Sequence, residues 1–348
     1  MRYLLYAEQN YSYAILRPLQ DAIHRRGDEV VWFLAGDEIR RDYLHADERE
    51  FTSIKDAVNW QPDVVLVPGN HVPKFIPGIK VGIFHGFNVA KSTRPDDRGH
   101  FNIRGCFDLY CTQGPNTTVG FQHRAEKYGF FGVRQTGWSA IDPLFQNLPT
   151  DLPNDGKKTI LLCSTFTKEL SCAPLLIENV RQLRDSGKWR WLVQFHPKMP
   201  QEIVAAYKAL QNEYLTFVET DNVIPLLQRA DLMVCDTSSV MTMFLLQRKP
   251  VVTFRNQTRG NTEHLINVTD ANRLEEAIDD ALSYPAALMA RIDRFIADTH
   301  PYQDGKSSER VLAAVDDFQC TQYGKLKAKP ANIIRTLKER NKLGYWKL

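Results

Sequence analysis

Residues 230–240 read Ala-Asp-Leu-Met-Val-Cys-Asp-Thr-Ser-Ser-Val, and the architecture of the chain can be worked out from them. The first six residues are mostly apolar, which predicts a short buried strand. The segment from Val240 to Arg248 is long enough for a helix, and Lys249-Pro250 is expected to end it. The turn between them holds Asp236, Thr237, Ser238 and Ser239. Free backbone N–H groups at such a turn favour phosphate, but these residue types are also preferred helix caps, so the turn alone leaves both interpretations open.

Short apolar segments alternate with helical segments along most of the chain. The expected strands are Tyr3–Ala7, Glu29–Ala35, Asp63–Val67, Lys80–Phe84, Leu109–Thr112, Thr159–Cys163, Trp191–Phe195, Thr216–Val218, Leu232–Cys235 and Val251–Phe254. The first expected helix covers Ser12–Arg26 and stops at Gly27, and another covers Asn116–Tyr128. This alternation predicts an α/β protein with parallel sheets and helices on both sheet faces.

The alternation is interrupted at residues 147–158, which are rich in Pro, Asp, Asn and Gly and predict a linker. A chain of 348 residues is also longer than one core usually supports. We therefore expect one α/β domain over residues 1–150, a second over 151–300 and a helical tail over 301–348. Two such domains that face each other would leave a central cleft at the carboxyl ends of their strands.

Composition excludes several classes of protein. Hydrophobic residues make up 43% and charged residues 24%, as in ordinary globular proteins, and a net charge of +3 does not indicate nucleic-acid binding. The six cysteines form no CxxC pair and no zinc pattern, which suits a reducing cytoplasm. The sequence contains no signal peptide, no run of 18 apolar residues, no phosphate-binding P-loop, no GxGxxG and no GxSxG.

Candidate polar residues follow expected strands at three places. His85 follows the strand that ends at Phe84, and His196 follows the strand that ends at Phe195, while the Asp236 turn follows Cys235. A single histidine after a buried strand is more often structural than catalytic. Three polar clusters at corresponding strand ends favour a functional site instead.

Several motifs occur in the order and spacing of a known family. They are Phe84-His85-Gly86, Phe107–Thr112, Thr136-Gly137-Trp138 with Asp142, Thr159–Phe166, Phe195-His196-Pro197, Asp231–Val240 and Lys249-Pro250-Val251. From about residue 80 to 260 the chain resembles the CDP-glycerol glycerophosphotransferase family, the polymerases and primases of teichoic-acid-like polymers. The resemblance implies a GT-B-like fold with two Rossmann-like domains. It also implies an acceptor-side first domain, a nucleotide-donor-binding second domain and release of CMP in cell-surface polymer synthesis.

The resemblance implies a role for each candidate residue. His85 is the expected base, and a cationic His196 is expected to stabilise the departing phosphate. Asp142 is expected to orient His85 or to bind the acceptor, and it equally fits a structural ion pair. The residues expected to hold the nucleotide and its phosphates are His196, Pro197, Lys198, Asp236, Thr237, Ser238, Ser239 and Thr165. Gly86 and Asn88 are expected to contact the acceptor. The donor would be CDP-glycerol or a related compound, with no tightly bound cofactor and no metal ligands, and dependence on a divalent metal stays open.

The chain departs from the family pattern at three points, so other functions stay open. Phe87-Asn88 replaces Thr-Pro after the His-Gly, Ala140 replaces an arginine, and Thr165-Phe166-Thr167 replaces Thr-Trp-Arg. One alternative is a GT-B glycosyltransferase that uses a CMP- or UDP-sugar for capsule or lipopolysaccharide. A sugar-nucleotide 2-epimerase and a non-enzymatic nucleotide-binding protein or scaffold are further alternatives.

The tail from Lys325 to Leu348 holds eight Lys or Arg residues and one acid, Glu339, interleaved with apolar residues and closed by Tyr345-Trp346. Such a segment fits an anionic membrane surface, and it equally fits a last helix packed back on the first domain. The expected partners are a nucleotide-activated donor and a lipid-linked or oligosaccharide acceptor. The expected location is the cytoplasm, with a peripheral position at the inner face of the plasma membrane left open by the tail.

Overall fold

The computed structural model describes residues 1–87, 99–146, 155–220 and 222–346. These residues form two compact units. The first unit, here called the first domain, contains the described residues up to Pro143 and those from Asp298 onward. The second domain contains the described residues from Leu144 to Ala297. Most of the predicted linker, residues 147–154, lies outside the described residues.

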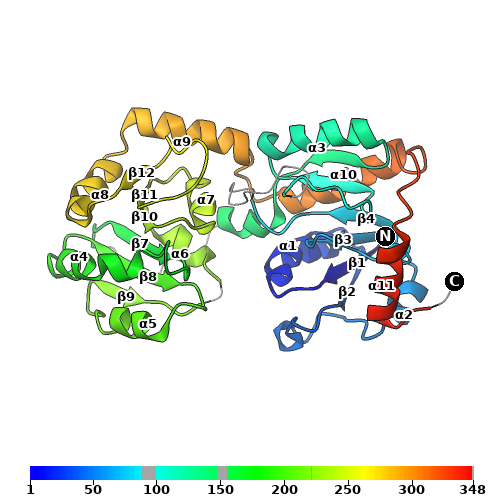
Figure 1. The fold of residues 1–348 in the computed structure, drawn as a ribbon, viewed down its shortest axis with the longest axis horizontal. Helices are drawn as coiled ribbons and strands as arrows, with labels where there is room; N and C mark the ends of the chain where they lie inside the picture. Colours follow the sequence, from blue (N-terminus) through cyan, green and yellow to red (C-terminus); the bar gives the residue numbers. More distant parts are fainter. Residues whose placement is uncertain (88–98, 147–154, 221, 347–348) are drawn as a thin grey trace. The chain divides into compact units, whose positions relative to one another are not determined.

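The first domain is built around a six-stranded sheet (Figure 1). Its strands are β1 (Arg2–Ala7), β2 (Glu29–Leu34), β3 (Val64–Val67), β4 (Ile79–Gly82), β5 (Leu109–Thr112) and β6 (Gly132–Gln135). Their order in space is β2-β1-β3-β4-β5-β6, and every neighbouring pair is parallel. The carboxyl ends of all six strands therefore lie along one edge of the sheet.

Helices from both ends of the chain cover this sheet. They are α1 (Tyr11–Arg25), α2 (Ile54–Asn59), α3 (Pro115–Tyr128), α10 (Ser307–Thr321) and α11 (Ile333–Leu343), with 3-10 helices η1 (Arg41–Tyr43) and η3 (Ser139–Phe145). α10 contacts α1 and β5 and buries Val311, Leu312, Val315 and Phe318. The first domain thus needs residues from far along the chain to complete its core.

The second domain contains a second six-stranded sheet. Its strands are β7 (Thr159–Ser164), β8 (Arg190–Phe195), β9 (Leu215–Phe217), β10 (Leu232–Cys235), β11 (Val251–Phe254) and β12 (Ile266–Val268). Their spatial order is β12-β11-β10-β7-β8-β9, again with parallel neighbours throughout. Helices surround the sheet (Figure 1): α4 (Ala173–Asp185), α5 (Gln201–Lys208), α6 (Ile224–Arg229), α7 (Val240–Leu245), α8 (Leu274–Leu282), α9 (Ala286–Thr299) and the 3-10 helix η4 (Ala271–Arg273).

Burial explains why these segments form strands. Every residue of β3, β7 and β10 is buried, as expected for strands with helices on both faces of their sheet. Each domain has its own apolar core, around Tyr110 and Phe121 in the first and around Trp191 and Tyr207 in the second. The structure confirms the predicted α/β class with two parallel-sheet domains. All six cysteines are free, and none of the helices in the described part of the chain is long and apolar enough to cross a membrane.

Candidate functional site

Three loops with predicted site residues follow neighbouring strands of the second domain. β10, β7 and β8 lie side by side in that order. The residues that directly follow them are Asp236, Thr165 and His196. Because the three strands are parallel, the loops emerge at the same edge of the sheet. The sheet order therefore gathers residues that are widely separated in the sequence.

Asp236 lies at the centre of this arrangement and is completely buried. Its carboxylate accepts hydrogen bonds from Ser164 Oγ at 2.6 Å, from the Thr165 backbone N–H at 3.0 Å and from the Cys172 N–H at 3.0 Å. These donors belong to the end of β7 and the loop after it. A buried anion with this set of partners would also repel a phosphate. Asp236 thus fixes the shape of the loop, in place of the direct phosphate contact expected from the sequence.

The other polar residues of the turn differ in how far they are exposed to a ligand. Thr237 is buried, where its hydroxyl donates to Asn256 Oδ1 at 3.2 Å and accepts from the Gln257 N–H at 2.9 Å. Ser238 is half-buried, and Ser239 is exposed and makes no side-chain capping bond. Helix α7 ends at Leu245, short of the predicted Arg248. The two serine hydroxyls, rather than a long helix dipole, are the donors that this turn offers to a ligand.

His196 is exposed, and its ring orientation is fixed by its own loop. The Lys198 backbone N–H donates to His196 Nδ1 at 3.1 Å, so the proton of the neutral ring lies on Nε2. The ring also packs on Phe166, with ring centroids 4.5 Å apart. Partial burial and the Lys198 ammonium lower the pKa of His196 below its ordinary value. With Nδ1 occupied by its own loop, His196 presents Nε2–H as the ring donor for a ligand.

A cavity of about 450 Å³ opens beside His196. Its lining comes from the end of β8, from α5 and from the segment after β9: Phe195, His196, Pro197, Gln201, Val204, Phe217, Val218, Glu219 and Thr220. The lining mixes apolar side chains with a few polar ones, as small-molecule sites do. The cavity adds Phe217 and Thr220 to the residues that sequence reasoning had selected.

His85 stands in the first domain directly after a strained turn. Phe84, the residue before it, has φ of 59°, a left-handed conformation that is rare for a bulky side chain. The Phe84 carbonyl accepts a hydrogen bond from Trp138 Nε1 at 3.2 Å, and the Gly86 carbonyl accepts one from Gln113 Nε2 at 2.8 Å. Bonds on both sides therefore hold the backbone while the His85 side chain is exposed. Sequence reasoning missed the supporting role of Trp138 and Gln113, which lie in separate loops.

The His85 ring lies against Tyr11, at the start of α1, with ring centroids 5.4 Å apart. Gly86 has open space where a side chain would stand, which leaves room for a ligand beside the histidine. Asn88, the other residue predicted to contact the acceptor, lies outside the described residues.

Asp142 has a structural environment that differs from the predicted one. It is buried and accepts hydrogen bonds from the Ser307 and Ser308 backbone N–H groups, both at 2.8 Å, and from Ser308 Oγ at 2.6 Å. These donors form the first turn of α10, whose N–H groups have no partners within the helix. Desolvation raises the pKa of Asp142, and the same hydrogen bonds oppose that rise. The carboxylate thus joins η3 to α10. Of the roles that the sequence left open, this is a structural one, made by hydrogen bonds in place of an ion pair.

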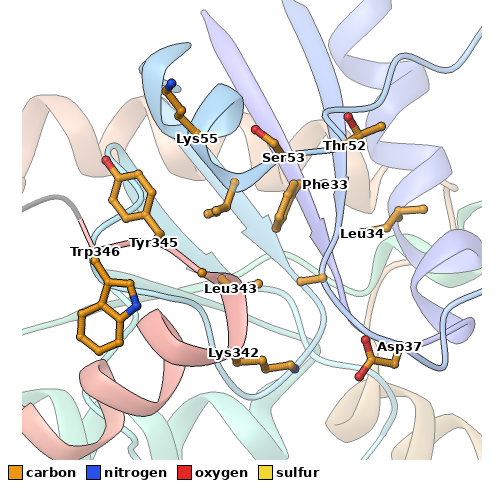
Figure 2. Close-up of a pocket in the computed structure, with 13 residues that line it drawn as sticks. Phe33, Leu34, Asp37, Thr52, Ser53, Lys55, Lys342, Leu343, Tyr345 and Trp346 are labelled. Atoms are coloured by element: carbon orange, nitrogen blue, oxygen red, sulfur yellow. The ribbon is translucent and has the colours of Figure 1, made fainter.

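A second cavity, of about 650 Å³, lies at the carboxyl end of β2 in the first domain (Figure 2). Its lining includes Phe33 and Leu34 from β2, Ser53 and Lys55 at the start of α2, and the segment Lys342–Trp346, which begins in the last turn of α11. The sequence left open that the tail packs back on the first domain, but no local pattern identified β2 and α2 as its neighbours. Among the described residues, no group of three or more His, Cys, Asp or Glu side chains is placed to hold a metal ion.

Comparisons with known proteins add a family and a fold. The family model for CDP-Glycerol:Poly(glycerophosphate) glycerophosphotransferase matches residues 152–317. No curated protein sequence matches the chain. The solved structure of the wall teichoic acid polymerase TagF resembles the chain with a TM-score of 0.62 and 15% identity, over 92% of this chain and 90% of that one.

Two further solved structures are also similar. A TagF variant with CDPG has a TM-score of 0.60 and 14% identity, over 90% of this chain and 87% of that one. The UDP-GlcNAc 2-epimerase from Neisseria meningitidis, bound to UDP-GlcNAc, has a TM-score of 0.62 and 11% identity, over 91% of this chain and 100% of that one. At these identities the similarities show the fold, which is of the GT-B type as predicted.

Proposed function

We propose a specific reaction for the protein, on the premise that residues 152–317 match the family model for CDP-Glycerol:Poly(glycerophosphate) glycerophosphotransferase. It transfers a glycerol-phosphate unit, or a similar polyol-phosphate, from a CDP-activated donor to an acceptor hydroxyl and releases CMP. The observation that carries this proposal is that the matched region contains both His196 and the Ser238-Ser239 turn. Sheet order brings the loops after β8 and β10 to one edge, beside the strand β7 that lies between them.

The second domain would hold the donor. The hydroxyls of Ser238 and Ser239 and the Nε2–H of His196 would donate to the phosphates. These donors are set before the reaction by Asp236, which shapes the loop after β7, and by the Lys198 N–H, which fixes the His196 tautomer. Preorganised donors stabilise the charge that develops on departing CMP. The 450 Å³ cavity beside His196 would receive the nucleoside.

The first domain would supply the base. His85 takes the proton from the acceptor hydroxyl, and the acceptor oxygen forms a bond to the phosphorus of the polyol-phosphate unit. The bond from that phosphorus to the bridging oxygen breaks, and CMP leaves with the electron pair. His85 suits this role because its side chain is exposed while Trp138 and Gln113 hold its backbone in place. Positioning by a rigid turn is what general-base catalysis requires.

Release of CMP tests the proposal. Purified protein is incubated with CDP-glycerol, CDP-ribitol, CMP-sugars or UDP-sugars, each with and without a crude lipid-linked acceptor, and the products are identified by mass spectrometry. We expect CMP from a CDP-polyol only when acceptor is present. His85→Ala should lower kcat roughly 10²–10⁴-fold, the usual contribution of a general base.

The matched control for His85→Ala is His123→Ala, which removes another exposed histidine of the same domain, on α3. It should leave the rate unchanged. Turnover of only a CMP- or UDP-sugar would replace the proposal with a glycosyltransferase for capsule or lipopolysaccharide. Conversion of a UDP-sugar without acceptor would indicate a 2-epimerase, and nucleotide binding without turnover would indicate a binding protein.

A lipid-linked acceptor would bring the enzyme to a membrane, and we extend the proposal to that location. The protein would act in the cytoplasm as a peripheral enzyme at the inner face of the plasma membrane, with Lys325–Leu348 toward the lipid. The excess of basic residues in this segment supports the assignment.

A further inference from the structure

Helix α11 has its apolar and polar sides reversed relative to an ordinary surface helix. Ile333 is 67% exposed, Ile334 is 74% exposed and Leu337 is 48% exposed. The half-buried positions that face the domain include Arg335, Thr336, Glu339, Arg340 and Leu343, of which only the last is apolar. In a soluble protein the apolar stripe of a helix normally faces the core. These three apolar side chains are therefore removed from water only if another surface binds to the outward side of α11.

Specific contacts hold α11 in this orientation. Asn332 Nδ2 and Arg335 Nη1 both donate to the Arg104 carbonyl, at 2.9 and 2.7 Å. At the other end, Tyr345 stacks on Phe75 with ring centroids 5.0 Å apart. With both ends attached, the helix cannot turn its isoleucines toward the domain without losing these contacts. The outward apolar face, here called the α11 face (Ile333, Ile334 and Leu337), is thus a fixed feature of the fold.

Charge around the α11 face indicates what would cover it. Eight Lys or Arg residues and one acid lie between Lys325 and Leu348, and that acid, Glu339, is half-buried on the inward side. Lys325, Lys327, Lys338 and Lys342 are exposed. Lys55 and Lys342 also line the cavity beside the last turn of α11 (Figure 2). Lys338 lies beside Ile333 and Ile334, while Lys342 pairs with Glu8. An apolar strip with a lysine beside it, in a segment rich in exposed lysines, is complementary to the anionic head groups and upper acyl chains of a lipid bilayer.

Trp346 adds a further membrane feature at the end of the segment. Its side chain is 57% exposed, and indole rings favour the boundary between head groups and acyl chains. α11 has 11 residues, too few to cross a bilayer, so it would lie in the plane of the surface. Shallow insertion of a few apolar side chains, strengthened by lysines, is the binding mode of interfacial helices.

We propose that α11 docks the protein on an anionic lipid bilayer, with Ile333, Ile334 and Leu337 inserted at the acyl boundary and the surrounding lysines at the head groups. The proposal rests on the proposed function only for the choice of a membrane over a protein partner. The sequence located a membrane contact only within the tail as a whole. The proposal now assigns that contact to three named side chains. Because the docking surface contains no proposed catalytic residue, the contact can be tested without turnover.

Vesicle sedimentation tests the proposal. The full protein is mixed with vesicles of phosphatidylcholine alone or of phosphatidylcholine with phosphatidylglycerol, and bound protein is measured after centrifugation. We expect binding only to the anionic vesicles, and weaker binding at high salt. The triple variant Ile333→Ser, Ile334→Ser, Leu337→Ser should bind at least about 10-fold more weakly, because each exposed apolar side chain contributes to insertion.

The matched control is the double variant Val119→Ser, Leu175→Ser, which removes exposed apolar side chains from α3 and α4. It should bind like the wild type, and circular dichroism should show all variants folded. Equal binding by the triple variant, or equal binding to neutral vesicles, would overturn the proposal. Self-association without lipid that the triple variant loses would also overturn it, in favour of a second copy of the chain.

A soluble-acceptor assay separates this proposal from the proposed function. CMP release with a soluble acceptor should be the same in the wild type and in the triple variant. Vesicle binding without CMP release would remove the transferase and keep the docking surface. CMP release without vesicle binding would support the transferase and overturn the docking surface.

Discussion

Asp236 accepts hydrogen bonds from a hydroxyl and two backbone N–H groups while it is out of contact with water. Asn in its place would offer one acceptor oxygen and would turn an NH₂ group toward donors. We expect Asp236→Asn to lower the free energy of unfolding by roughly 2–3 kcal/mol, since buried donors lose their partners. Urea unfolding measures this loss.

The matched comparison is Ser239→Ala, at the exposed position of the same turn, which should leave the unfolding midpoint unchanged and weaken donor binding. A stable Asp236→Asn protein with a raised KM alone would show that Asp236 contacts the ligand, and would remove its role as the anchor of the loop.

The two aspartates and the two histidines show what a sequence can indicate about single residues. Both histidines were expected directly after strands, and both side chains are exposed. His196 does follow β8 directly, whereas β4 ends at Gly82 and His85 stands three residues further on, after the turn at Phe84. Asp142 and Asp236 were also noticed, but their partners are donors from loops or helices far along the chain. A motif shows that a carboxylate is present at a strand end. Only the folded structure shows whether that carboxylate faces a ligand or accepts hydrogen bonds from backbone N–H groups of other segments.

Elements were predictable where the apolar run was clear. β10 and β11 have the predicted bounds, Leu232–Cys235 and Val251–Phe254. β6, Gly132-Val-Arg-Gln, was missed because it has one apolar side chain and relies on pairing with β5. β12, Ile266-Asn-Val, was missed because it is three residues long. Edge strands of this kind are defined by their neighbours more than by their own composition.

Helix α11 carries a pH-dependent contribution to stability. Burial raises the pKa of Glu339 to about 7, with Glu8 adding to the rise and Arg335, Lys74 and Lys342 opposing it. The folded state therefore holds this proton more tightly than the unfolded chain, so the stabilisation is complete at low pH and is lost as pH rises through about 7. We expect Glu339→Gln to stabilise α11 at about pH 8 by roughly 1 kcal/mol, after allowance for solvent, and much less at about pH 5.

Hydrogen exchange of the α11 amides, compared between wild type and Glu339→Gln at the two pH values, measures the effect. Glu126→Gln, which changes an exposed glutamate on α3, provides the control and should leave α11 protection as it is. Identical protection in wild type and Glu339→Gln at both pH values would mean that Glu339 is ionised without cost in the folded protein.

At the scale of the whole molecule, the chain returns to its first domain after completing the second. α10 supplies five buried apolar side chains to the first domain, with Ala314 among them, and its first turn holds the buried Asp142 carboxylate. We expect a chain that ends at Ala297 to lose cooperative unfolding of the first domain while the second domain keeps its own transition. Both transitions should be visible by calorimetry, with limited proteolysis to identify the protected fragment.

A chain that ends at Thr321 is the control, because it keeps α10 and lacks α11. It should retain both transitions. If the chain that ends at Ala297 also unfolded with a cooperative first-domain transition, α10 would not be needed for the stability of that domain. Asp142 would then have to be hydrogen-bonded by groups other than those of α10. The division of the chain was predicted near residue 150. The role of α10 in completing the first core was not predicted, because it depends on contacts with α1 that no local pattern encodes.

The position of α10 in the chain also sets an order of events at the ribosome. The six strands of the first sheet are translated early, whereas the helix that covers Asp142 and its neighbours emerges only after the entire second domain. The second domain can fold as soon as it leaves the exit tunnel, since its described residues all lie between Leu144 and Ala297. The first sheet has to wait, with apolar surface uncovered, until the second domain and α10 have been synthesised. Chaperones that bind nascent chains would therefore meet this protein through its amino-terminal half.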